Sequence, residues 1–294
     1  ATSVNRADLM QRHGNYPPPP GAPPYLGLEM AGTVAEIGAV ETEFRPGDRV
    51  CGLLAGGGYA ERVAVHHKLL TRLPERLSYQ EAAAIPEAFY TAFVNLFLEA
   101  GLTRGETVLI HAGASGVGTA AIQLAREDCR VLATAGLEEK LACCRRLGAE
   151  LAVNYRSDAG VGVADFATAV LDHCDGVDVI LDVAGASHLQ ANVEILNTKG
   201  RLVIISLLGG ATETLDLNAV LRKRLRIVGS LLRSRPVEEK IDIVSQFQER
   251  FWPALEHGSI APLIHSVLPI TEAEEAHRQL RENENIGKVV LEVP

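Results

Sequence analysis

The sequence is poor in cysteine and in aromatic residues. Its 5 cysteines among 294 residues are odd in number, and their spacing fits neither a disulfide framework nor a zinc knuckle. Cys143 and Cys144 adjoin in a predicted helix, where we expect both to be small buried residues. Aromatic residues make up only 5%, so the core must be built from Ala, Val, Leu and Ile, as in buried parallel strands. Free thiols are typical of a reducing compartment, so we expect a cytoplasmic protein.

Positive charge and long apolar runs are also scarce. The 28 Lys and Arg residues against 37 Asp and Glu residues give a net charge of −9, which would repel a polyphosphate, so no nucleic-acid partner is expected. The short basic run Arg222–Arg224 is interpreted as a solvated helix end. No run reaches the length of a membrane span and no signal peptide opens the sequence, so no membrane partner is expected.

Residues 1–87 are predicted to form a compact β-rich domain. Ala1–Asp8 has the pattern of a strand end that enters a helix, so we expect the given sequence to begin inside this domain. Short runs separated by glycine then predict strands, at Glu29–Ile37, Arg49–Leu54 and Tyr59–Val65. Ser78 and Glu81 resemble a capping box at the start of a helix.

Residues 88–230 alternate between strand and helix patterns, which predicts an α/β fold with a doubly wound parallel sheet, a Rossmann domain. The predicted strands are Thr107–His111, Arg130–Ala135, Leu151–Asn154, Val177–Val183, Arg201–Ser206 and Arg226–Ser230. Residues 231–294 hold a predicted helix, Val237–Glu256, and a last strand, Lys288–Val293. We expect this C-terminal segment to return to the first domain.

A glycine-rich turn follows the first strand of the alternating region. Gly113, Gly116 and Gly118 lie between that strand and a helix predicted over Val117–Glu127. Glycines here let backbone N–H groups approach a pyrophosphate, and the start of the helix adds a positive dipole. Because strand, turn and helix occur in the right order, the turn Ala112–Gly118 is predicted to bind a dinucleotide.

The end of the next strand favours NADPH over NADH. NAD sites place an acidic residue there to hold the ribose hydroxyls, but this strand ends in the small, uncharged residues Ala133–Gly136. Lys140, one helical turn further on, supplies a cation for a 2′-phosphate. Glu138 and Glu139 would oppose this assignment if their side chains pointed inward.

The segments Gly27–Gly38 and Pro46–Val50 resemble the medium-chain dehydrogenase/reductase superfamily. Zinc alcohol dehydrogenases carry Gly-His-Glu at the start of the first segment, with the His on catalytic zinc, whereas this sequence has Leu28 there. It therefore resembles the zinc-free quinone oxidoreductase branch, most closely its p53-inducible group. Further strings carry this resemblance: Asn5–Arg12, Ala82–Glu87, Ser230–Arg235 and Asn285–Val290.

The resemblance implies a GroES-like catalytic domain, whose first strands we expect to be missing from the given sequence. It also implies a homodimer that uses NADPH to reduce quinones or related enones by direct hydride transfer, without a metal. The cofactor contacts it implies are Tyr16, Ala112, Gly113, Ser115, Gly116, Val117, Gly118, Lys140, Tyr155, Leu207, Gly209, Leu231, Leu232, Arg233 and Asn285. Asn5 and Tyr16 are the expected catalytic residues, since an amide or phenol beside the nicotinamide could hydrogen-bond a developing oxyanion. The pair His66 and His67 is interpreted as solvated.

Two other functions stay open at this point. One is an NADPH-binding sensor or crystallin-like module with little turnover. The other is an enoyl-thioester reductase, which would need a large cleft with a basic rim. The sequence does not identify the quinone or enone.

Overall fold

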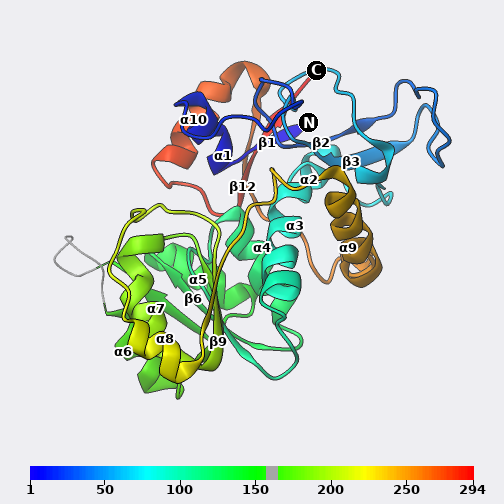
Figure 1. Cartoon of the computed structure of the whole chain (residues 1–294). Helices are drawn as coiled ribbons and strands as arrows, with labels where there is room; N and C mark the ends of the chain where they lie inside the picture. Colours follow the sequence, from blue (N-terminus) through cyan, green and yellow to red (C-terminus); the bar gives the residue numbers. More distant parts are fainter. Residues whose placement is uncertain (157–164) are drawn as a thin grey trace. The chain divides into compact units, whose positions relative to one another are not determined.

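The computed structural model describes residues 1–156 and 165–294 (Figure 1). The chain divides into two compact units. Unit 1 consists of residues 1–91 and 232–294, and unit 2 of residues 92–231. The two units are described one at a time.

Unit 2 is built on a six-stranded parallel sheet, which confirms the predicted Rossmann fold. The strands lie in the order β10-β9-β8-β5-β6-β7, so the chain reverses direction across the sheet between β5 and β8, where such folds bind their ligands. The strands are β5 (Thr107–Ile110), β6 (Arg130–Ala135), β7 (Leu151–Asn154), β8 (Val177–Asp182), β9 (Leu196–Ile204) and β10 (Arg226–Gly229).

The helices of unit 2 alternate with these strands. They are α4 (Gly116–Ala125), α5 (Glu138–Leu147), α6 (Phe166–His173), α7 (Leu189–Ile195) and α8 (Leu217–Lys223). A 3-10 turn, η3 (Gly185–His188), precedes α7, and a π-helical segment, η2 (Val94–Glu99), precedes β5. Gly148 ends α5 with a φ of 115°, a left-handed conformation that suits glycine. Cys143 and Cys144 are buried on α5, as predicted.

The core of unit 2 is aliphatic, in keeping with the composition. Leu109, Leu132, Ile180 and Leu202 lie on four neighbouring strands and are fully buried. Helix α6 closes this cluster through Phe166 and Val170. The central strands are buried on both faces because helices cover both sides of the sheet.

Unit 1 contains two three-stranded sheets, in the orders β2-β3-β4 and β1-β12-β11. The strands are β1 (Thr2–Val4), β2 (Glu29–Thr33), β3 (Arg49–Leu53), β4 (Leu70–Arg72), β11 (Ile264–Pro269) and β12 (Lys288–Glu292). Strand β1 pairs antiparallel with β12, with Ser3 opposite Val290. The C-terminal strand therefore lies beside the N-terminal one.

One helix of unit 1 matches its sequence signal. Ser78 and Glu81 form the predicted capping box of α2 (Tyr79–Ala82). Helix α3 (Pro86–Phe93) follows. The other elements are α1 (Arg6–Arg12), η1 (His67–Leu69), α9 (Val237–His257), η4 (Ile270–Glu272) and α10 (Ala273–Arg281).

One predicted strand, Tyr59–Val65, is wrong. Gly58 packs so closely against Gly27 that a Cβ on Gly27 would lie 2.5 Å from the Gly58 Cα atom. The Tyr59 N–H bonds the Leu26 carbonyl, and the Tyr59 hydroxyl lies 3.0 Å from Nε2 of His277. These contacts hold Gly58 and Tyr59 in a conformation other than a strand. The strand that pairs with β3 on this side is β4 instead. The strand predicted from Glu29 ends early, at Thr33.

Candidate functional site

The glycine-rich turn of unit 2 has no room for side chains at two of its glycines. A Cβ on Gly118 would lie 2.3 Å from the Ala112 carbonyl oxygen, and one on Gly113 would lie 2.8 Å from the Ala133 Cβ atom. Ala112 itself takes a left-handed φ of 52°, which costs free energy for a residue with a side chain. The turn therefore holds a tight backbone at the end of β5.

The first turn of α4 offers backbone N–H groups and no acidic side chain. Ser115 caps the helix, because its Oγ atom accepts a hydrogen bond of 3.0 Å from the Gly118 N–H. Gly116 and Val117 occupy the first two helical positions, where N–H groups have no acceptor within the helix. This helix start fits the pyrophosphate of a dinucleotide.

The end of β6 is surrounded by cationic and phenolic groups. A Cβ on Gly136 would lie 2.8 Å from Nε of Arg156 and 3.0 Å from the Tyr155 hydroxyl. Tyr155 is held there because its N–H bonds the Ala135 carbonyl at 3.1 Å. Lys140 lies in the first turn of α5, after the residue Leu137, which gives the helix no side-chain cap.

The two acidic residues of α5 lie on its exposed surface. The Glu138 carboxylate forms an exposed ion pair of 2.8 Å with Arg145, and Glu139 is exposed. Arg156 was not among the residues expected from the sequence. Its signal was present, since it follows Tyr155 directly after β7, and parallel neighbouring strands end at the same edge of a sheet.

A buried histidine pair lies behind the glycine-rich turn. His111 is 2% exposed and is held between Thr134 Oγ1, at 3.0 Å, and Asn192 Oδ1, at 2.7 Å. The His188 ring packs edge-on against it, with 4.8 Å between centroids. Burial lowers the pKa of both imidazoles to about 4. His111 is therefore a neutral structural residue at pH 7.

The loop after β9 is braced against η3. The Gly209 N–H bonds the Ala184 carbonyl at 2.7 Å, and a Cβ on Gly209 would lie 2.0 Å from the Ser187 Oγ atom. Leu207 and Leu231 expose about half of their surfaces, at 53% and 51%. Leu207 lies on this braced loop and Leu231 follows β10 (Arg226–Gly229), and each offers an apolar surface for a flat ring.

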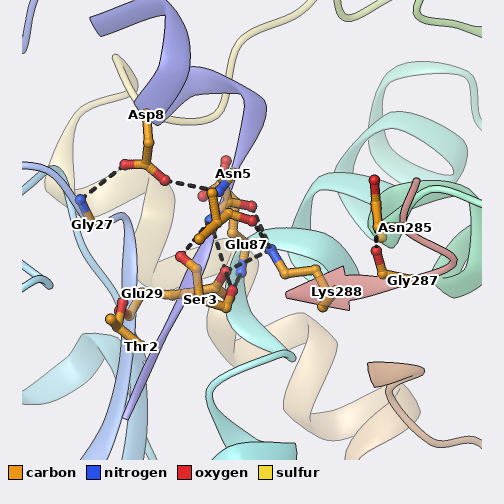
Figure 2. Close-up of polar contacts among 12 residues, drawn as sticks. Thr2, Ser3, Asn5, Asp8, Gly27, Glu29, Glu87, Asn285, Gly287 and Lys288 are labelled. Atoms are coloured by element: carbon orange, nitrogen blue, oxygen red, sulfur yellow. Dashed lines mark hydrogen bonds and ion pairs between the residues drawn. The ribbon is translucent and has the colours of Figure 1, made fainter. Parts of the chain in front are cut away.

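Unit 1 holds a buried polar cluster, drawn in Figure 2, around the carboxylate of Glu29. Glu29 is inaccessible to solvent. Its Oε1 atom accepts hydrogen bonds from Asn5 Nδ2 at 2.8 Å, from Lys288 Nζ at 2.9 Å and from the Ser3 hydroxyl. Its Oε2 atom accepts from the Glu87 N–H at 2.9 Å. Four donors thus surround this carboxylate.

Asn5 is fully engaged in the same cluster. Its amide nitrogen donates to Glu29, and its Oδ1 atom accepts from Lys288 Nζ at 2.5 Å. Its backbone N–H bonds Asp8 Oδ2 at 2.8 Å at the start of α1. The Asn5 side chain therefore orients the Glu29–Lys288 pair.

Two other carboxyl groups lie in this cluster. Asp8 accepts from the backbone N–H groups of Asn5 and Gly27, yet burial raises its pKa to about 6. Glu87, in the first turn of α3, has a pKa raised to about 8 by burial and then by the charge of Glu29. Its Oε2 atom is shut off from solvent and has no hydrogen-bond partner among the described residues.

Tyr16 and Arg233 stack on one another in unit 1. The Arg233 guanidinium lies over the Tyr16 ring, 5.3 Å from its centroid. Its Nε donates to the Ala55 carbonyl at 2.8 Å and one Nη to Gln11 Oε1 at 2.7 Å. The other, Nη1, is buried without a partner in residues 1–156 and 165–294. Burial raises the pKa of Tyr16, so its hydroxyl keeps its proton.

Other cofactor contacts expected in unit 1 lie in ordered surroundings within that unit. Leu232 is buried at 5% exposure. The Lys240 ammonium donates to the Arg233 carbonyl at 2.6 Å, which fixes the backbone of that residue. Asn285 Nδ2 donates to the Gly287 carbonyl at 2.7 Å, so its Oδ1 atom is the one left to meet a ligand.

The position expected of a zinc ligand carries a buried leucine, Leu28, at 1% exposure. Within the part of the chain that the structure describes, no three His, Cys, Asp or Glu side chains are grouped to hold a metal ion. His66 is exposed, and its ring stacks on His67 with 5.0 Å between centroids. In the same described ranges, no helix has the length and apolar character needed to cross a membrane.

Comparisons with known proteins identify the family. The chain matches the profile of the alcohol dehydrogenase GroES-like domain over residues 1–75 and that of the zinc-binding dehydrogenase family over residues 116–248. It is 32% identical over 296 residues to a quinone oxidoreductase of Lama guanicoe, covering 99% of this chain and 86% of that protein.

Two solved structures are similar over nearly the whole chain. The quinone oxidoreductase from Thermus thermophilus, also solved in complex with NADPH, is 35% identical with a TM-score of 0.81, covering 99% of this chain and 88% of that one. The CurK enoyl reductase is 27% identical with a TM-score of 0.84, covering 100% and 89%. The chain therefore belongs to the medium-chain dehydrogenase/reductase superfamily, and it is an oxidoreductase of the kind that binds a nicotinamide cofactor.

Proposed function

We propose that the chain is an NADPH-dependent reductase of quinones or related electron-poor enones that works without zinc. The observation that carries the cofactor choice is the end of β6, where Arg156 Nε and the Tyr155 hydroxyl pack directly against Gly136. A phosphate bound at this strand end would meet a guanidinium and a phenol, with Lys140 on the adjoining helix start. The quinone assignment is supported by the quinone oxidoreductases to which the chain is similar.

The remaining cofactor contacts follow the residues inferred from the family resemblance. In unit 2, the turn from Ala112 to Gly118 holds the pyrophosphate, and Leu207, Gly209 and Leu231 contact the nicotinamide side. In unit 1, the same resemblance gives Tyr16, Leu232, Arg233 and Asn285 as cofactor contacts. When bound, NADPH supplies the hydride, and the protein binds, orients and excludes water.

The two expected catalytic residues take different parts. Tyr16 remains protonated and can donate a hydrogen bond to an oxyanion that forms on the substrate. Asn5 has its amide nitrogen and oxygen committed to Glu29 and Lys288. We assign it a positioning role beneath the reacting groups.

The test is NADPH oxidation, followed by absorbance, with and without an ortho-quinone. Quinone-dependent oxidation is the expected result. Tight NADPH binding without quinone-dependent oxidation would refute the reductase and support the binding module. The similarity to an enoyl reductase makes an enoyl thioester the second acceptor to assay, and faster turnover of the thioester would change the substrate class.

Cofactor selectivity has a separate test. Lys140→Ala is expected to weaken NADPH binding about 10-fold or more and NADH binding little, because only NADPH carries the 2′-phosphate. Equal effects on both cofactors would exclude Lys140 as a reader of that phosphate.

We also propose that two copies associate through the outer strand of unit 2. Strand β10 ends the sheet order, and three of its four residues are exposed, Ile227 at 36% among them. Leu217 and Leu221 on α8 are 70% and 76% exposed. An open strand edge favours pairing with an identical edge. Sedimentation of an Ile227→Glu variant should show monomers where the wild type shows dimers, and a monomeric wild type would refute the pairing.

A further inference from the structure

Glu87 differs from the other two carboxyl groups of the buried cluster in unit 1. The Glu29 carboxylate accepts hydrogen bonds from four donors, and the Asp8 carboxyl accepts them from two backbone N–H groups. The Oε2 atom of Glu87, by contrast, is enclosed and meets no donor among the described residues, although the backbone N–H of Glu87 serves Glu29. An ionised carboxylate in this setting would be strongly destabilised.

The charges around Glu87 decide which carboxyl carries a proton. Glu29 on β2 and Asp8 on α1 raise the pKa of Glu87, whereas Lys288 on β12 and Lys240 on α9 lower it. Burial is the largest effect, and the balance raises the pKa to about 8. Glu87 is therefore mainly a neutral carboxylic acid at pH 7, a state in which the group is a donor.

Glu87 is within electrostatic range of two groups assigned to the reaction. Burial raises the pKa of Tyr16 and a charge on Glu87 raises it further, and the same charge raises the pKa of Arg233. Arg233 stacks on Tyr16 and keeps Nη1 buried without a partner in the described ranges. Glu87 as a residue is half-buried, and its Oε2 atom is the enclosed part. A carboxylic acid, a phenol and a guanidinium are thus electrostatically coupled in unit 1, and an oxygen that gains negative charge beside them would be stabilised.

We propose that Glu87 is the general acid of the reaction, which gives its carboxyl proton to the oxyanion that hydride transfer leaves on the substrate. This inference rests on the proposed reductase function. Hydride from NADPH adds to the quinone and leaves NADP⁺ and a hydroquinone monoanion. The O–H bond of Glu87 then breaks, the second O–H bond of the hydroquinone forms, and the Glu87 carboxylate takes a proton back from solvent. A phenol is a weaker acid than this carboxyl, so the transfer runs downhill.

The first experiment compares pH profiles of kcat/KM for the quinone in wild type and Glu87→Gln. The glutamine keeps the size and the backbone N–H to Glu29 but has no acidic proton. Wild type should lose activity above about pH 8, while the variant should be about 100-fold slower and should lack that decline. Glu249→Gln, which removes an exposed carboxylate of α9 in the same unit, should match wild type. Fluorescence titration with NADPH verifies that each variant is folded and binds.

The second experiment does not depend on turnover. Infrared difference spectra between pH 6 and pH 10 should show a protonated-carboxyl band that is lost near pH 8 in wild type and absent in Glu87→Gln. If wild type turns over quinone and the variant keeps both its rate and its alkaline decline, the proposal is overturned. If wild type turns over no acceptor, the proposed function fails instead, and loss of the band well below pH 7 would then overturn the neutral acid on its own.

Discussion

The buried pair of Lys288 and Glu29 makes a strong prediction about stability. Lys288 is 5% exposed and Glu29 is inaccessible to solvent. The ammonium donates to Glu29 at 2.9 Å, to Asn5 at 2.5 Å and to the Val4 carbonyl at 3.3 Å. Lys288→Met removes these bonds and leaves the Glu29 carboxylate without its cation, next to the half-buried carboxyl of Glu87.

The cost follows from the desolvation of the remaining charge. Removing one partner of a buried ion pair typically destabilises by about 3–5 kcal/mol. In a unit of this size each kcal/mol shifts the melting temperature by roughly 2–4 °C, so Lys288→Met should lower the melting temperature of unit 1 by roughly 6–20 °C. Adding Glu29→Gln removes the orphaned charge and should restore a large part of that loss.

The assay can follow unit 1 alone. Trp252, the single tryptophan of the chain, is buried at 7% exposure in α9, so its fluorescence reports the unfolding of that unit. Lys68→Met, which removes an exposed lysine of the same unit, is the control and should shift the midpoint little. If Lys288→Met behaves like this control, or if the double variant is less stable than the single one, the electrostatic reasoning is wrong.

Three further predictions concern unit 2. Gly136→Asp should weaken NADPH binding about 100-fold or more and spare NADH, since a carboxylate would displace Arg156 and repel a phosphate; titration with both cofactors measures this. Arg156→Gln should weaken NADPH selectively, whereas the exposed Arg146→Gln on α5 should not, and equal losses would remove Arg156 from the site. Because His111 and His188 have pKa values of about 4 instead of 6.5, unfolded chains bind more protons than folded ones between these values. The stability that these imidazoles contribute to unit 2 is full above pH 6.5 and should fall by a few kcal/mol as pH drops to about 4. An unfolding midpoint of unit 2 that stays flat over that range would contradict neutral imidazoles.

The sequence predicted unit 2 well because its signals are local. The bounds of β6, β7 and α5 match their predicted ranges, since periodicity and a terminal glycine mark them. Unit 1 was harder to predict because its order depends on contacts between distant residues. Neither β11 nor α10 was predicted: β11 alternates half-buried and exposed residues, and α10 is rich in charge.

The candidate site also has one part that the sequence predicted and one part that it did not. The glycine-rich turn lies between a strand and a helix as predicted, because the glycines that its tight backbone requires are close together in the sequence. The cluster around Glu29 could not be predicted, since Ser3, Glu87 and Lys288 come together only through the pairing of β1 with β12 and the packing of α3. Arg156 has no local signal apart from its place after a strand. The roles of these residues in binding and catalysis remain predictions.

The discontinuity of unit 1 has a consequence for its synthesis. Residues 1–91 leave the ribosome well before 232–294, while unit 2, which is continuous in sequence, can fold in between. Until β12 emerges, β1 lacks its partner and Glu29 lacks the ammonium of Lys288. Residues 1–91 therefore cannot complete their fold until then, and we expect Glu29 to stay hydrated. Ribosome stalling or truncation before Lys288 should yield a folded nucleotide-binding half attached to an unfinished, protease-sensitive one.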